Sequence, residues 1–84
     1  MSSVKVKICG LRRREDIEYV NQYKPDFIGF FFYEKSKRAV SAAQAQELKQ
    51  LLDKQIKAVG VFVNAEPQLI ARLVASKTID LVQL

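Results

Sequence analysis

The 84-residue chain has no histidine and no tryptophan, and it has a single cysteine, three glycines and two prolines. Without histidine there can be no Ser-His-Asp triad, no Cys-His pair and no histidine-based metal site. One cysteine, Cys9, excludes an internal disulfide and a zinc site built from cysteines. The three glycines stand far apart, so there is no Gly-x-Gly-x-x-Gly loop of the kind that cradles phosphates. The chemistry that remains open centres on one thiol and on charged side chains.

Long hydrophobic runs are also absent: none approaches the length that spans a bilayer, and the first residues do not resemble a signal peptide. We therefore expect a soluble chain in the reducing cytoplasm, with no membrane partner. Lys and Arg number 14 against 9 Asp and Glu, which gives a net charge of +5. This excess favours an anionic partner, but the charges are scattered, so no nucleic-acid partner is predicted. The length supports one small core and no second domain.

Apolar runs alternate with segments of helical spacing along the chain. Strands are predicted at 4–8, 27–32, 57–63 and 79–84, and helices at 14–23, from the cap Ser41 to Leu52, and from about Pro67 onward. Gln44 is the expected capping-box partner of Ser41. The last helix is expected to bury one face, formed by Leu69, Ile70, Leu73 and Val74.

This order of elements, β-α-β-α-β-α-β, predicts an α/β fold with parallel strands and right-handed crossovers. Two architectures accommodate it: a small doubly wound sheet, or about half of a (β/α)8 barrel, which when complete needs roughly 200 residues or more. In both architectures functional residues lie at the carboxyl ends of the strands. The candidate positions are therefore Cys9-Gly10, the loop 33–38, Asn64 and whatever follows the last strand.

Cys9 lies at the end of the first predicted strand, and its parity matches Lys5 and Lys7 rather than Ile8. In a barrel the aliphatic residues would pack on the helices, leaving Lys7 and Cys9 on the inner side. A thiol becomes an effective base or nucleophile when a nearby cation stabilises the thiolate, and Lys7 is a candidate for that cation. The alternative is a small buried hydrophobic residue.

The loop after the second strand places three cations beside a hydroxyl, and its Arg38 suits bidentate recognition of a carboxylate or phosphate. The alternative is a solvated loop. The arginines at 12–14 either attract an anion or form a solvated helix start. The phenylalanines at 30–32 either stack on an aromatic substrate or belong to the core.

Several motifs in a consistent order carry a family resemblance. They are Lys7-Ile8-Cys9-Gly10-Leu11 with Glu15-Asp16, Asp26-Phe27-Ile28-Gly29-Phe30, Ser36-Lys37-Arg38-Ala39-Val40-Ser41, Val59-Gly60-Val61-Phe62-Val63-Asn64 and Asp80-Leu81-Val82-Gln83-Leu84. Together they resemble phosphoribosylanthranilate isomerase, a (β/α)8 TIM-barrel enzyme of tryptophan biosynthesis. The resemblance covers nearly the whole chain.

This resemblance implies a phosphorylated small-molecule substrate and no cofactor or metal. The family converts N-(5-phosphoribosyl)anthranilate to 1-(2-carboxyphenylamino)-1-deoxyribulose 5-phosphate by an Amadori rearrangement. By resemblance, Cys9 is the general base that takes the proton from ribose C2, and Arg38 binds the anthranilate carboxylate. Lys37 departs from the pattern, because the family has proline there.

The family's general acid is an aspartate on a later strand, and its phosphate-binding loops follow strands seven and eight. None of these falls among the matched motifs, and Asp80 lies at the wrong end of its strand to replace the acid. We therefore expect residues 1–84 to form one partial domain, the N-terminal half of the barrel, with negligible activity alone. The alternatives are a non-catalytic folding or assembly module, whose outer strands self-associate or dock with the missing half, and a doubly wound anion-binding module.

Overall fold

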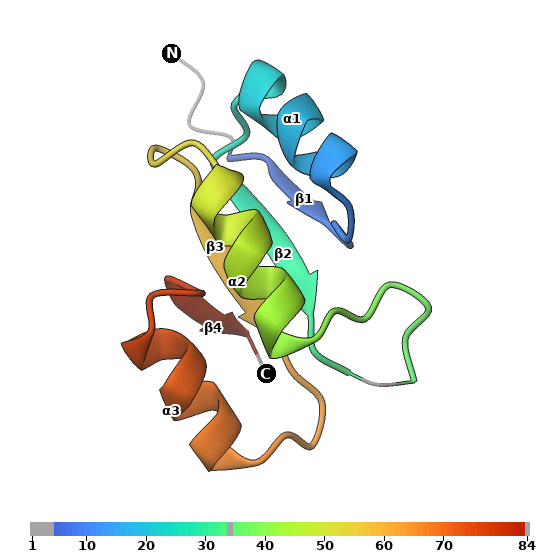
Figure 1. The fold of residues 1–84 in the computed structure, drawn as a ribbon, viewed down its shortest axis with the longest axis vertical. Coiled ribbons are helices and arrows are strands. Elements are labelled where there is room, and N and C mark those ends of the chain that lie inside the picture. Colours follow the sequence, from blue (N-terminus) through green and yellow to red (C-terminus); the bar gives the residue numbers. More distant parts are fainter. Residues whose placement is uncertain (1–4, 34, 84) are drawn as a thin grey trace.

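The computed structural model describes residues 5–33 and 35–83 as a four-stranded parallel sheet with three helices (Figure 1). In chain order the elements are β1 (Lys7–Cys9), α1 (Arg14–Tyr23), β2 (Phe27–Phe31), α2 (Ala42–Leu51), β3 (Lys57–Val61), α3 (Pro67–Ala75) and β4 (Leu81–Gln83). None of these helices is both long and apolar enough to cross a bilayer. The predicted α/β order is confirmed.

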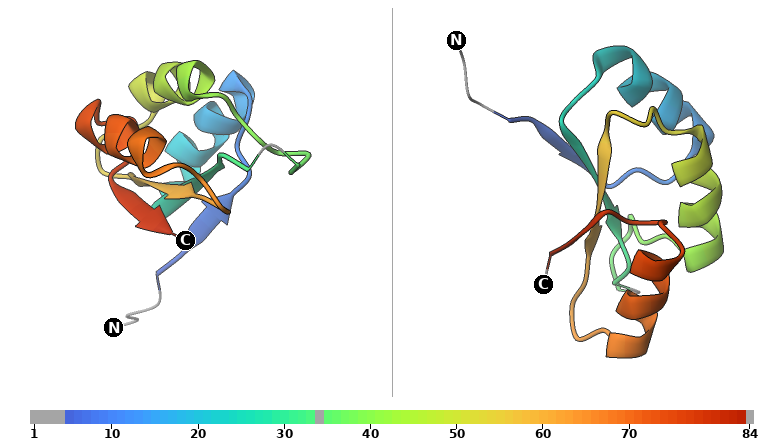
Figure 2. Two further views of the ribbon diagram at one scale, coloured as in Figure 1. Left: turned by 90° about the horizontal axis from the view of Figure 1, so that it is seen from below. Right: turned by 90° about the vertical axis from the view of Figure 1, so that its left-hand side faces the viewer.

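The winding of the sheet decides between the two architectures that the sequence left open. The strands lie in the order β1-β2-β3-β4, each one parallel to its neighbour. All three helices cover the same face of the sheet, and the opposite face is left uncovered (Figure 2). A doubly wound sheet reverses its strand order at a switch point and carries helices on both faces. The doubly wound alternative is therefore wrong, and the winding is that of a (β/α)8 barrel.

Alternate residues of each strand point to the two faces of the sheet. On the helix side, Ile28, Phe30 and Ala58 are completely buried, and Ile8 packs against them. The intervening positions form a row on the uncovered face, because Cys9 pairs with Gly29, Gly29 with Val59, and Val59 with Leu81. The predicted parity of the first strand is confirmed for Ile8, whereas Val6 is 52% exposed and its expected packing on the helices is wrong.

Local signals placed the helix starts well and the strand ends less well. The first helix has the predicted bounds, and the Ser41 hydroxyl accepts a hydrogen bond from the Gln44 N–H at 3.1 Å. β2 and β3 end before their apolar runs do, and β4 begins two residues into its run, because an apolar run follows burial whereas a strand requires pairing. β1 ends at Cys9, one residue past its predicted end. Of the first predicted strand, residue 4 lies outside the described residues.

The exposed side of α3 departs from the expected pattern. Leu73 is buried and Leu69 and Ile70 pack against the core, but Val74 is 45% exposed, so its predicted burial is wrong. Helical spacing placed it beside the buried face, but no helix of the described residues covers that flank of α3 (Figure 1). Val74 is thus an apolar residue on the surface of α3 and does not belong to the core of the described residues.

Candidate active site

The Cys9 thiol lies over the neighbouring strand at the carboxyl edge of the sheet. A Cβ atom placed on Gly29 would lie 2.8 Å from Cys9 Sγ, closer than real contacts allow. The thiol therefore occupies the space that any other residue at position 29 would fill. Cys9 is free and half-buried, on the uncovered face. The sequence pointed to Cys9, but the need for glycine beside it follows only from the register of the two strands.

Arg38 lies against the turn that follows Cys9. A Cβ placed on Gly10 would be 2.5 Å from Arg38 Cδ and 3.1 Å from its Nη1, so the arginine side chain runs across the Gly10 backbone. Gly10 has a φ of 86°, in the left-handed region that favours glycine, and its N–H donates to the Gly29 carbonyl at 3.0 Å. The structure thus brings the two predicted site residues, 29 positions apart, to one turn.

Hydrogen bonds order the loop that carries Arg38. The Ser36 hydroxyl accepts from the Arg38 N–H at 3.1 Å, and the Ser36 carbonyl accepts from the Ala39 N–H at 3.2 Å. The Val40 N–H donates to the Phe31 carbonyl at 2.8 Å. The loop therefore has a hydrogen-bonded backbone on both sides of Arg38, while the side chains of Lys35, Lys37 and Arg38 are exposed, as the solvated-loop alternative predicted.

The other predicted cations take different places. Lys7 Nζ donates to Gln83 Oε1 of β4, across the uncovered face, so its ammonium is directed away from β1. Arg12 Nη1 donates to the Lys37 carbonyl at 2.7 Å, and the exposed Arg13 lies 3.9 Å from Asp16. Arg12 and Arg13 therefore do not converge on one anion site. The cation that lies at the turn after Cys9 is Arg38.

Asp16 anchors this turn from the start of α1. Its Oδ2 accepts from the backbone N–H groups of Arg12 and Arg13, each at 3.1 Å. Partial burial raises the pKa of Asp16, but these hydrogen bonds and the two guanidinium charges outweigh it, so the pKa lies below its ordinary value. The carboxylate thus stabilises the helix start in its ionised form.

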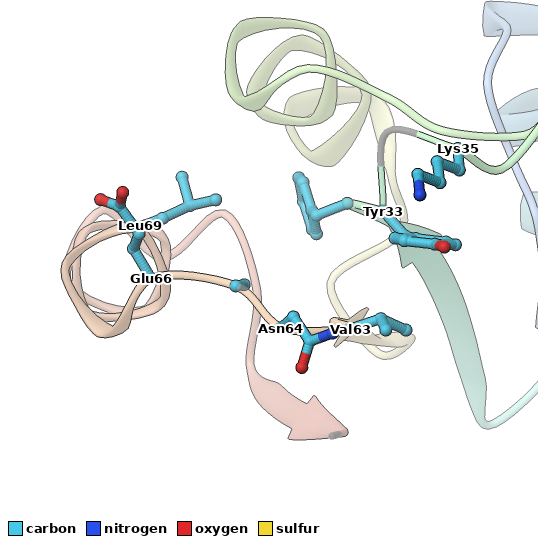
Figure 3. A pocket seen from close by; sticks show the side chains of 8 residues that line it. Tyr33, Lys35, Val63, Asn64, Glu66 and Leu69 are labelled. Carbon is cyan, nitrogen blue, oxygen red and sulfur yellow. The ribbon is translucent and has the colours of Figure 1, made fainter.

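An open hollow of about 500 Å³ lies at the same edge, between the loops that follow β2 and β3. Figure 3 shows Tyr33 and Lys35 on one side of it, Glu66 and Leu69 on the other, and Asn64 between them. Asn64 has a φ of 52°, so the chain turns sharply there, three residues after the end of β3. Of the three phenylalanines at 30–32, Phe30 is buried in the core and Phe32 packs against the core, stacking on the buried Phe62 with ring centres 5.2 Å apart, whereas Phe31 is partly exposed.

The consecutive winding and the carboxyl-edge cluster define the class of the protein as part of a (β/α)8 barrel. Within residues 5–33 and 35–83, no three potential metal-ligating side chains gather. The family model of N-(5'-phosphoribosyl)anthranilate (PRA) isomerase matches residues 6–84. The chain belongs to this family.

Relatives in sequence and structure agree with the family model. The chain is 54% identical over 80 residues to N-(5'-phosphoribosyl)anthranilate isomerase of Thermoanaerobacter sp. strain X514, a match that covers 95% of this chain and 39% of the relative. The match to the Acetivibrio thermocellus isomerase is also 54% identical, over 94% of this chain and 36% of that protein. The chain therefore spans about two fifths of the length of these relatives.

Solved structures show the same fold. The phosphoribosylanthranilate isomerase of Thermotoga maritima superimposes with a TM-score of 0.89 at 40% identity, over 96% of this chain and 40% of that protein. Equally similar is a structure of the isomerase in complex with reduced 1-(o-carboxyphenylamino)-1-deoxyribulose 5-phosphate, with a TM-score of 0.89, 40% identity and coverage of 96% and 42%. These similarities bear out the expected barrel family and leave the roles of Cys9 and Arg38 as predictions.

Proposed function

We propose that this chain carries part of the active site of a phosphoribosylanthranilate isomerase, with Cys9 as general base and Arg38 as carboxylate-binding residue. The observation that supports this most directly is the passage of the Arg38 side chain over Gly10, next to Cys9. A base and a cationic fork then lie at one edge of the sheet. The ligand of a structurally similar isomerase carries an aromatic carboxylate and a phosphate, which is the kind of molecule such a fork would orient.

The chemistry assigned to these two residues is a proton transfer under fixed orientation. Once the ring C1–O bond has broken to give a C1=N iminium, the Cys9 thiolate accepts the proton from ribose C2. The electron pair of that C–H bond forms a C1–C2 double bond, and the π pair of the C1=N bond moves to the nitrogen and neutralises its charge. Arg38 holds the carboxylate through two parallel N–H donors, which sets the angle of the substrate against the thiolate. Opening the ribose ring requires an acid that protonates the ring oxygen.

By family resemblance, that acid and the phosphate-binding loops belong to strands beyond the matched residues. We propose that residues 1–84 form one partial domain, the N-terminal half of the barrel, with negligible turnover alone, because a base without acid and phosphate anchor lacks most transition-state stabilisation. Its place of action is the cytoplasm, where reducing conditions keep the thiol free.

The partner of the domain is the remainder of such a barrel. Among the described residues β1 pairs only with β2, and β4 only with β3, so each outer strand offers a free parallel edge. Leu81 and Val82 of β4 are 46% and 42% exposed. We propose that these edges take the remaining strands, or pair with a second copy in their absence. If the 84-residue chain sediments as a monomer at all concentrations, the proposed pairing with a second copy is contradicted.

The deciding experiment completes the barrel. The 84 residues are joined to the part of the Thermotoga maritima isomerase that lies beyond its matched 40%. Loss of phosphoribosylanthranilate fluorescence is then followed for the completed protein, for the chain alone and for the Thermotoga part alone. We expect turnover only from the completed protein, and loss of about three orders of magnitude in Cys9→Ala, as for the removal of an essential base.

Two results would overturn the proposal. A completed protein with native-like circular dichroism but no turnover would remove the assigned activity. Turnover that survives Cys9→Ala would remove the assigned base. Turnover by the chain alone that disappears in Cys9→Ala would instead contradict the need for an acid from later strands.

A further inference from the structure

We propose that Arg12 is a positioning residue, which holds the backbone of Arg38 so that its guanidinium stays over the Gly10 turn. This inference rests on the proposed function of Arg38. It concerns a side chain whose sequence context predicted only a solvated helix start or a diffuse attraction for anions.

The contacts converge on a single peptide group. The carbonyl of Lys37 accepts from Arg12 Nη1 at 2.7 Å, and the N–H of Arg38 donates to Ser36 Oγ at 3.1 Å. These two atoms are the opposite ends of the peptide that joins residues 37 and 38. Because both ends are bonded, the rotation of this peptide is restricted, and with it the direction in which the Arg38 side chain leaves the backbone.

The other end of the contact is itself fixed. The Arg12 N–H donates to Asp16 Oδ2 at 3.1 Å, and the Arg12 carbonyl accepts from Gln44 Nε2. Arg12 is thus tied to the first turns of α1 and α2 at the same time. The Gln44 side chain was expected to complete the cap of its own helix, but it reaches the Arg12 backbone instead. Because the backbone of Arg12 is held in place, a single hydrogen bond from its side chain can orient the loop that contains Lys37.

The expected kinetic effect is specific. The carboxylate contact exists in the bound substrate and in the transition state alike, so its loss weakens uniform binding and raises KM with little change in kcat. For Arg12→Ala in the completed barrel we expect KM to rise on the order of fivefold, which corresponds to the net contribution of one ordinary intramolecular hydrogen bond. We expect kcat to stay within about twofold.

Two variants separate positioning from general damage. In Arg12→Lys we expect a KM close to that of the wild type, because the Lys37 carbonyl accepts from one donor only. In Arg38→Lys we expect a raised KM, because bidentate binding of a carboxylate needs two donors. Arg14→Ala is the matched control, since it removes an exposed arginine from the same segment. It leaves KM unchanged.

A second measurement does not depend on activity. Hydrogen exchange of the Arg38 amide in the completed protein accelerates in Arg12→Ala and stays at the wild-type rate in Arg14→Ala. Unchanged exchange or unchanged KM in a folded Arg12→Ala variant overturns the positioning role. A folded wild-type protein without turnover overturns the proposed function instead, so the two failures are distinguishable.

Discussion

The two faces of the sheet are built from alternate residues of the same strands, yet they follow different rules. On the helix-covered face, Ile28, Phe30 and Ala58 are fully buried and apolar, so almost any well-packed aliphatic or aromatic set would serve. On the uncovered face, Cys9 needs the empty space above Gly29. Residues on the covered face thus stabilise the fold by filling the space between sheet and helices. On the uncovered face, Gly29 positions a reactive group by leaving room for it.

The largest expected effect is on the covered face. Phe30→Ala removes a fully buried ring and should lower the free energy of unfolding by about 3–5 kcal/mol, since the space cannot collapse between sheet and helices. A domain of marginal stability then unfolds. Thermal circular dichroism of the completed barrel measures this. Tyr23→Ala, which removes a 65% exposed ring at the end of α1, is the control. An equal loss of unfolding free energy in both variants would contradict the special contribution of the buried Phe30 ring.

Gly29→Ala tests the uncovered face. The added methyl would meet Cys9 Sγ at 2.8 Å and must move the thiol. We expect a loss of stability of about 1–2 kcal/mol from overpacking, but a fall in kcat of at least about tenfold, because the base leaves its position. Urea unfolding and isomerase kinetics on one sample give both numbers. A variant as active as wild type would mean that the thiol position is not set by Gly29.

The smallest effect concerns the turn at the carboxyl edge, which is stabilised by hydrogen bonds to the Asp16 carboxylate and not by the packing of apolar side chains. The pKa of Asp16 lies below the value of 3.8 expected in the unfolded chain, so ionised Asp16 stabilises the fold above about pH 4. This contribution disappears as the pH falls through the lowered pKa. Asp16→Ala should cost about 1 kcal/mol at pH 7 and less at pH 2.5, which lies below the pKa of the unfolded chain.

Urea unfolding at the two pH values measures this difference. Glu15→Ala removes the neighbouring exposed carboxylate and should change stability little at either pH. If the cost of Asp16→Ala is the same at pH 2.5 and pH 7, the ionised carboxylate is not what holds the turn.

Local signals predicted much of this molecule. The acidic first turn and apolar spacing placed α1 at its observed bounds, and Ser41 capped α2 as expected. Strand parity placed Cys9 opposite to Ile8. Gln44 and Val74 were misjudged, because the partners of a side chain depend on which distant segments the fold places beside it. No periodicity along the chain contains that information.

The amino-acid sequence by itself determined the alternation of strands and helices, the opposite orientation of Ile8 and Cys9 in the first strand, and the two candidate site residues. These depend on hydrophobic spacing, on caps and on residue chemistry, which are local. The tertiary structure alone decided that the strands wind consecutively with every helix on one face, that Gly29 makes room for the thiol, and that Arg38 crosses Gly10. The reason is physical: strand order and register arise from packing between segments far apart in the chain.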